Sequence, residues 1–357
     1  MRQFRCEHCN HAVYFHNDVC GNCGARLGFI PDERQLAAFS IAPDGSHLRY
    51  RDSPRYWRPC SNYPSACLCN WMVETSDPNP LCRSCRLTAT IPDQRLPENQ
   101  TAWLQLESAK RAWLYSILEL HLPARSRIED PVRGMAFHFL RQIDARKPVL
   151  TGHDSGDITI NALESDPVQR ERSRHELHEP YRTLLGHFRH ESGHYYWDQL
   201  IRDTAFVEPF RTLFGDERED YGGALKRHYA EGPRPDWQNG FVSGYATMHP
   251  WEDWAETWAH YLHLVDLLDT GRGWQLKIEG FEDRLIVEQI PGEVQLSDEF
   301  VAMVREWIPL TLLANSLNRS LGHGDAYPFA LSYLALRKIQ FVHDVVRPFR
   351  PTVAIGG

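Results

Sequence analysis

The sequence lacks long hydrophobic runs and any strong excess of charge of one sign. No stretch reaches the roughly 18 consecutive apolar residues of a membrane-spanning helix, and the segment from Met1 to Cys6 lacks the apolar core of a secretion signal. The 39 basic and 47 acidic side chains give a formal charge of -8, which does not attract nucleic acid or anionic membranes. We therefore expect a cytoplasmic protein without a membrane partner, and we do not expect a nucleic-acid partner.

Cysteine is absent after residue 85, although the chain continues to residue 357. All nine cysteines lie between Cys6 and Cys85, several of them in C-x-x-C pairs, and in a reducing compartment this pattern favours metal over disulfides. The cysteine-rich part is short and rich in turn residues, so we expect it to need metal in order to fold. This composition predicts a double zinc-ribbon module over 1–95, a catalytic core over 96–270 and a helical C-terminal extension over 271–357, packed on the core.

The first four cysteines form two knuckles, and the remaining five form a second group. The pairs Cys6-x-x-Cys9 and Cys20-x-x-Cys23 are ten residues apart, which is typical of a structural zinc ribbon in which four thiolates close a tetrahedral site. The second group has one thiol more than such a site needs, and only its last two cysteines form a secure C-x-x-C pair of ligands. It consists of Cys60, Cys67, Cys69, Cys82 and Cys85.

Beyond the cysteines, the apolar spacing is mainly helical. We predict helices from Thr101 to about Leu118, over 131–144, over 180–200 and over 250–268, with a mainly helical remainder. Two short strands are predicted at 149–151 and 158–161, joined by a turn, and the second is the expected edge strand of its sheet. Neither an internal repeat nor a low-complexity tract is present.

The chain contains the motif H-E-x-x-H at His190, Glu191 and His194. On a helix the two histidines are one turn apart on the same face, so both can bind one zinc ion. Glu191 lies beside them, where its carboxylate can take a proton from the attacking water and deliver it to a leaving amine. The alternative is a pair of polar histidines on a surface helix.

A catalytic zinc needs a third protein ligand, and Glu252 is the best candidate. Glu256 lies one helical turn later on the same face and can orient a ligand histidine, with Asp253 and His249 as further neighbours of the ligands. The alternative is that these acids only solvate the first turn of a helix and favour its dipole. For the oxyanion that forms during amide hydrolysis we favour Tyr245 as the donor, with His249 second.

These residues resemble the active site of the gluzincins, the class that includes the catalytic domain of anthrax lethal factor. The resemblance is carried by the H-E-x-x-H motif and by Tyr245, which precedes Glu252 by seven residues. It implies that Glu252 is the third zinc ligand and that Tyr245 stabilises the transition state. It covers only the active-site segments and implies nothing about the substrate.

A second resemblance extends over nearly the whole chain, to bacterial zinc-binding metallopeptidases with an N-terminal zinc ribbon. It is carried by the paired C-x-x-C motifs and by several longer strings. These strings are Cys69-Asn-Trp71, Thr151-Gly-His-Asp154, Tyr181-Arg-Thr-Leu-Leu-Gly-His-Phe-Arg-His-Glu191 and His249-Pro-Trp-Glu-Asp-Trp-Ala-Glu-Thr-Trp-Ala-His260. The resemblance favours Cys60 and Cys69 as partners of the last cysteine pair and leaves Cys67 spare, although an exchange between Cys67 and Cys69 stays open.

Taken together, the residues and the resemblances predict an α+β protein with a mainly helical, zincin-like metallopeptidase core. We expect one catalytic and two structural Zn²⁺ ions and a peptide or protein substrate, although a site of two histidines and one glutamate accepts other divalent ions. The main alternative is a non-proteolytic scaffold whose zinc ribbons bind a protein partner. The presence of Glu191 favours the enzyme, because a scaffold does not need a base.

Overall fold

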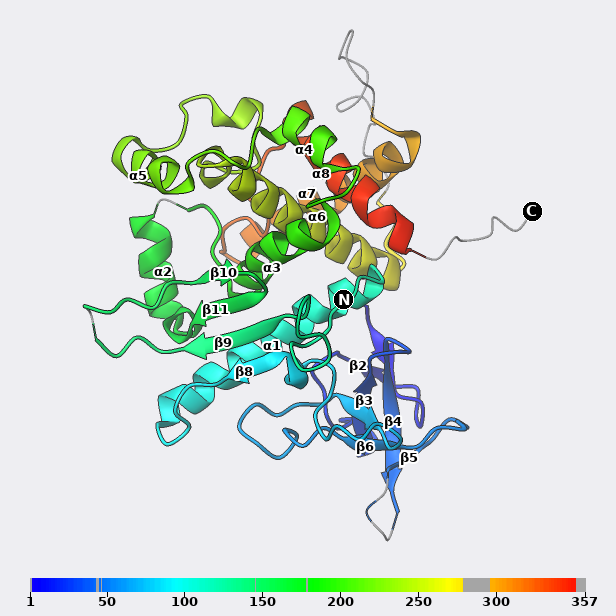
Figure 1. The fold of residues 1–357 in the computed structure, drawn as a ribbon. Coiled ribbons are helices and arrows are strands. Elements are labelled where there is room, and N and C mark those ends of the chain that lie inside the picture. The colour runs from blue at the N-terminus through cyan, green and yellow to red at the C-terminus, as the bar shows by residue number, and fades with distance from the viewer. Residues whose placement is uncertain are drawn as a thin grey trace. The chain divides into compact units, whose positions relative to one another are not determined.

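The computed structural model combines helices and sheets in two compact units, 1–188 and 189–357 (Figure 1). It describes residues 2–42, 45, 47–144, 146–177, 179–278 and 296–350. The division between the units falls inside one long helix, and the predicted domain boundaries near 95 and 270 stay predictions. None of the helices in these described ranges has the length and apolar character needed to cross a bilayer.

The first unit begins with a β-rich region that carries all the cysteines. Strands β1 (Phe4–Arg5) and β2 (Ala12–Val13) form a small antiparallel pair. Five further strands form an antiparallel sheet in chain order: β3 (Arg26–Ile30), β4 (Gln35–Ile41), β5 (His47–Arg49), β6 (Trp57–Pro59) and β7 (Met72–Glu74). A bridge between Phe29 and Trp71 connects the first strand of this sheet to the segment that precedes its last strand.

This sheet has an apolar core of its own, made of Ile30, Ala37, Phe39, Trp57 and Met72. Close packing extends to Gly28, where an added Cβ would lie 2.4 Å from the sulfur of Met72. Strands from different parts of this region thus combine their side chains in one apolar core, and the expectation that the region needs metal in order to fold stays a prediction.

The first unit continues with a second sheet and two helices. The sheet has the order β10-β11-β9-β8 and contains β8 (Thr88–Thr90), β9 (Ala136–Leu140), β10 (Gly152–Asp154) and β11 (Asp157–Asn161). Strand β9 is parallel to both β8 and β11, and β10 is antiparallel to β11. The helices are α1 (Pro97–Glu119), as predicted, and α2 (Pro167–Glu176), which has no buried residue.

Three predictions for this sheet are wrong. Residues 131–144 contain strand β9 instead of a helix, because Phe137 and Phe139 are buried on a strand whose parallel partners come from distant segments. The expected edge strand, 158–161, lies inside the sheet as part of β11, and β10 forms the edge. The predicted strand 149–151 moves to Gly152–Asp154, because Ser155 and Gly156 form a tight two-residue turn with φ of 50° and 95°.

The second unit is helical. After α3 (Leu184–Leu200), which begins in the first unit, it contains α4 (Val207–Phe214), α5 (Tyr221–Glu231), α6 (Pro250–Gly273), α7 (Asp298–Ser320) and α8 (Tyr333–Val346). Helix α6 packs against α4, α7 and α8. The helix predicted over 250–268 is thus confirmed and extends to residue 273. Helix α3 begins four residues later than predicted, because the Thr183 side chain accepts a hydrogen bond from the backbone N–H of Gly186 at 3.0 Å.

Helices α3 and α6 approach each other closely in the second unit. A Cβ added to Gly193 would lie 2.9 Å from the Cα of Ala255, so only glycine fits at this point. Two buried tryptophans of α6 hold the contact: Trp254 Nε1 donates to the Gly193 carbonyl at 2.8 Å, and Trp258 Nε1 donates to Ser192 Oγ at 3.2 Å. This packing aligns the helix that carries the histidine motif with the helix that carries the two predicted glutamates.

Candidate metal centres

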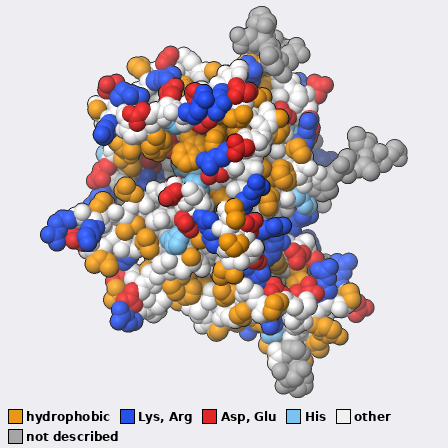
Figure 2. All heavy atoms as spheres, in the orientation of Figure 1, with side chains coloured by type: hydrophobic (Ala, Val, Ile, Leu, Met, Phe, Trp, Pro, Cys, Tyr) orange, Lys and Arg blue, Asp and Glu red, His pale blue; other side chains and the backbone are white. Residues whose placement is uncertain are grey.

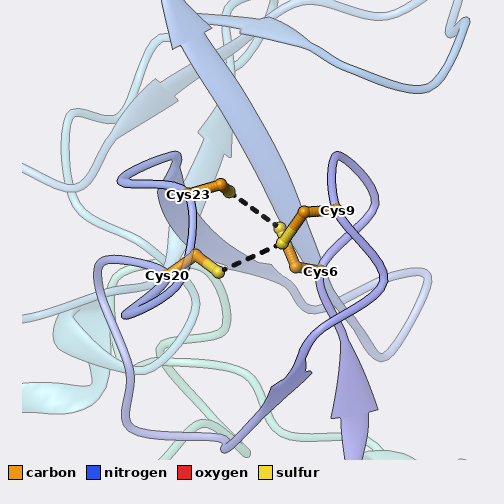
Figure 3. Close-up of side chains that lie close together, drawn as sticks. All are labelled: Cys6, Cys9, Cys20 and Cys23. Atoms are coloured by element: carbon orange, nitrogen blue, oxygen red, sulfur yellow. Dashed lines mark hydrogen bonds between the residues drawn. The ribbon is translucent and has the colours of Figure 1, made fainter.

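The first four cysteines converge at two tight turns in the first unit (Figure 3). The Sγ atoms of Cys6 and Cys23 are 3.8 Å apart, and those of Cys9 and Cys20 are 3.6 Å apart. Zinc–thiolate bonds of about 2.3 Å place the sulfurs of a tetrahedral site about 3.8 Å from one another, so the observed separations fit zinc. Two of these four cysteines are buried and two are partly exposed.

The second group consists of Cys60, Cys69, Cys82 and Cys85, and each of its side chains is at most 1% exposed. The sulfurs of Cys69 and Cys82 are 3.5 Å apart. Backbone N–H groups orient the thiolates, because Cys82 N donates to Cys60 Sγ at 3.3 Å and Cys85 N donates to Cys82 Sγ at 3.4 Å. This donor set also fits a closed tetrahedral zinc site.

Cys67 lies outside this four-cysteine group. Its thiol accepts a hydrogen bond from Ser65 Oγ at 3.4 Å and lies 3.5 Å from the carbonyl oxygen of Asn62. Between Cys67 and Cys69, the alternatives that the sequence leaves open, the structure therefore brings Cys69 together with the other three cysteines.

The histidine motif lies on α3, with the His190 and His194 rings one turn apart and their centroids separated by 5.1 Å. One donor atom each from His190, Glu191 and His194 lies within 4.8 Å of the other two. Glu191 and His194 are buried, whereas His190 is partly exposed. The three side chains therefore form a compact cluster that could hold a metal ion.

Glu252 adds a second carboxylate to this cluster from the first turn of α6. Its Oε2 lies 3.0 Å from His190 Nε2, and its Oε1 lies 3.4 Å from His194 Nε2. Zinc bonds of about 2.0–2.1 Å to nitrogen and oxygen would place tetrahedral ligand atoms about 3.3 Å apart. The two contacts, each through a different oxygen of Glu252, are close to this separation. Burial by itself raises the pKa of Glu252, but the two histidines outweigh it and hold the pKa well below its usual range.

Glu256 and Ser243 fix the orientation of His190. Glu256 Oε1 lies 2.6 Å from His190 Nδ1, and Ser243 Oγ donates to Glu256 Oε2 at 2.6 Å. Because Nδ1 faces this carboxylate, Nε2 is the nitrogen that faces Glu252. Burial lowers the pKa of His190, but Glu252 and Glu256 outweigh this effect and raise it well above its usual value. The sequence singled out Glu256 but missed Ser243.

Two tyrosines approach the same cluster. The ring of Tyr245, the predicted oxyanion donor, lies 5.9 Å from the His190 ring between centroids. Tyr221 at the start of α5 donates a hydrogen bond from Oη to Glu252 Oε1 at 2.8 Å. Burial and then the Glu252 charge raise the pKa of both phenols, so both remain protonated donors at neutral pH. The sequence missed Tyr221 because nothing in its pattern relates it to Glu252, 31 residues later.

The structure gives His249 and Asp253 other partners. His249 caps α6 by accepting a hydrogen bond from Trp251 N at 3.1 Å, and its Nε2 lies 3.2 Å from the Glu219 carbonyl oxygen. Asp253 forms a buried ion pair of 2.6 Å with Lys338 of α8, and burial outweighs this pair to raise the Asp253 pKa to about 7. Both residues therefore position the first turn of α6, which presents Glu252.

Three further histidines near the motif in sequence or on α6 also have other partners. His187 Nε2 lies 3.1 Å from Glu164 Oε2 within the first unit. In the second unit, His260 is hydrogen-bonded to Tyr327, and His263 Nδ1 lies 2.7 Å from a guanidinium nitrogen of Arg189. Each of these three histidines therefore has a side-chain partner outside the metal-binding cluster.

The face drawn in Figure 2 carries interspersed acidic and basic side chains, in keeping with the small net charge. This distribution gives no strong electrostatic preference for a polyanion or a polycation on that face.

Comparison with known proteins identifies two family matches. A model described as "putative zinc-binding metallo-peptidase" matches residues 99–345, and a zinc-ribbon domain model matches residues 3–96. Uncharacterized proteins of Mycobacterium bovis and Mycobacterium tuberculosis are each 41% identical to this chain over 353 residues, covering 98% of this chain and 97% of the relative. No solved structure gave a significant match.

Proposed function

Because the chain belongs to this metallopeptidase family and carries an N-terminal zinc ribbon, we propose that it is a zinc-dependent peptidase of the gluzincin type with a zincin-like core. The observation that carries the proposal is the contact of Glu252 with Nε2 of both His190 and His194, beside Glu191. Two imidazoles and one carboxylate are the protein ligands of a large class of catalytic zinc sites.

Two carboxylates, Glu191 and Glu252, compete for the third ligand position. Glu252 is favoured because it touches both histidines at distances that suit ligands of one ion, and because Tyr221 and the capped first turn of α6 hold it in place. Glu191 shares a helix turn with the histidines and remains for proton transfer. Glu256 keeps His190 in the orientation that offers Nε2 to the metal.

When bound, zinc acts as a Lewis acid that polarises the scissile carbonyl and makes water acidic enough to react near neutral pH. Glu191 removes the proton from the attacking water and delivers it to the nitrogen of the leaving amine. Tyr245 donates its phenolic proton in a hydrogen bond to the developing oxyanion, a role for which its raised pKa suits it. Glu191, His194 and Glu252 are buried, which strengthens the electrostatic interactions among them.

The test compares zinc content per chain in wild type, in a His190→Ala/Glu252→Ala double variant and in Glu191→Gln, all purified identically. We expect about three zinc ions in wild type and in Glu191→Gln, and about two in the double variant, as the closed cysteine sites and one His₂Glu site require. Glu191→Gln should cut peptide cleavage by about 10²–10⁴-fold, the usual contribution of a general base.

Other results would change the assignment in defined ways. Loss of the third zinc from Glu191→Gln but not from a Glu252→Ala single variant would exchange the roles of the two glutamates. Two zinc ions in every variant, with none gained on adding zinc to wild type, would favour the non-proteolytic scaffold. A wild type with three zinc ions that cleaves no member of a broad peptide library would retain the site but reject the peptidase.

A further inference from the structure

The second four-cysteine group differs from the first in its charge environment. A zinc ion with four thiolates carries a net charge of -2, and all four side chains here are at most 1% exposed. Removing such a charge from water is costly unless an opposite charge lies nearby. The first group reduces this cost through solvent, because Cys9 and Cys23 are partly exposed. The second group needs a compensating charge from the protein.

Arg111 of α1 is the charged side chain that meets this need. It is only 3% exposed, and Nη2 donates a hydrogen bond to the Cys67 carbonyl oxygen at 3.3 Å. Its Nε and Nη1 atoms are buried and have no hydrogen-bond partner. Burial acts against the charge of Arg111, but Cys69 and then Glu107 and Cys85 outweigh burial and raise the Arg111 pKa above its usual value. Because the carbonyl that Arg111 contacts belongs to the residue two positions before Cys69, the guanidinium lies beside the segment that carries this ligand.

The other buried cation nearby is already neutralised. Lys110 Nζ lies 2.9 Å from Glu107 Oε1, and neither side chain is exposed to solvent. Thr88 Oγ1 donates to the same carboxylate oxygen at 2.6 Å. Since Lys110 and Glu107 cancel, Arg111 is left as the net positive charge of this buried cluster.

We propose that Arg111 is the built-in counter-ion of the second four-cysteine zinc site, and that the Cys67 segment serves to anchor it. The guanidinium offsets half of the -2 charge from outside the ligand shell, where partners of metal sites commonly act. Cys67 contributes its backbone carbonyl, so its thiol is not required as a ligand.

This arrangement joins two parts of the chain that the family models separate. The cysteines belong to the zinc-ribbon match at 3–96, whereas Arg111 belongs to the metallopeptidase match at 99–345, and both lie in the first compact unit. The second zinc therefore stabilises the position of α1 as well as the ribbon. The inference concerns a structural zinc and does not depend on the proposed peptidase activity.

The experiment measures the alkylation rate of each cysteine by peptide mass spectrometry during exposure to a zinc chelator, using the full-length zinc-loaded chain. We expect Arg111→Met to raise the rates at Cys60, Cys69, Cys82 and Cys85 by about 10- to 100-fold, the usual effect of removing a partner of a metal ligand. Arg111→Lys keeps the charge and should stay close to wild type. The first group of cysteines should keep its wild-type rates in both variants.

Two controls separate charge from packing. Arg49→Met removes another arginine of the same unit, one whose side chain is 5% exposed and pairs with Glu7 and Glu33, and it should not raise the rates at the second group. Circular dichroism at the same zinc concentration checks that each variant is folded. If Arg111→Met is unfolded while Arg111→Lys is folded, the result supports Arg111 as the counter-ion. The counter-ion role would be overturned if Arg111→Met and Arg111→Lys behaved alike at the second group. This holds whether both variants match wild type, both release zinc faster or both fail to fold.

Discussion

The cysteine centres of the first unit and the histidine centre of the second unit are built in different ways. Each cysteine group draws its four donors from a short stretch of chain and closes the coordination sphere. The histidine centre gathers His190, His194 and Glu252 from two helices and depends on side chains from further segments, such as Ser243 and Tyr221. We infer that metal at the cysteine centres supports the fold, and that metal at the histidine centre serves chemistry within a fold that exists without it.

The largest expected effect is the loss of the buried cysteine centre. Cys82→Ser removes a fully buried ligand and leaves the remaining thiolates and Arg111 without their metal. Because structural zinc contributes on the order of 10 kcal/mol and a domain is stable by only about 5–15 kcal/mol, we expect the first unit to unfold. Circular dichroism and zinc content measure the outcome. The His190→Ala/Glu252→Ala variant should keep its helical signal. If this variant unfolds to the same degree as Cys82→Ser, the histidine centre supports the fold as much as the cysteine centre does.

A smaller effect should distinguish the two cysteine centres from each other. Cys9 is partly exposed, so Cys9→Ser lets water replace the lost ligand, and we expect a lower thermal midpoint rather than global unfolding. A thermal scan of Cys9→Ser beside Cys82→Ser, at the same zinc concentration, makes the comparison. If Cys9→Ser lowers the thermal midpoint more than Cys82→Ser does, burial of the cysteines does not determine which site contributes more to stability.

The smallest effect concerns the histidine centre alone. Tyr221→Phe removes the hydrogen bond to Glu252 and leaves a buried carboxylate oxygen with one partner fewer, at a cost of about 1–3 kcal/mol. We expect this change to weaken zinc binding at that centre by about tenfold while the thermal midpoint stays within a few degrees of wild type. Competition with a zinc chelator of known affinity provides the measurement. Tyr229→Phe is the matched control, because Tyr229 is 65% exposed on the same helix.

Prediction from sequence succeeded where the pattern was local. The helices predicted over 101–118 and 250–268 depend on residues a few positions apart, and the structure confirms them; the C-x-x-C and H-E-x-x-H residues, which are also locally spaced, lie together in the structure. It failed at residues 131–144, where strand β9 receives both of its neighbours from elsewhere in the chain. A strand that depends on parallel partners carries little signal of its own.

The sequence by itself determined which residues could bind metal and that they fall into cysteine and histidine sets. Only the tertiary structure decided which cysteine of the Cys67 and Cys69 pair joins the second group, that Tyr221 and Ser243 support the histidine centre, and that Arg111 donates to the Cys67 carbonyl oxygen beside the second group. The physical reason is the same in each case. Donor chemistry belongs to individual residues, whereas distance, burial and charge compensation arise only when segments far apart in the chain pack together.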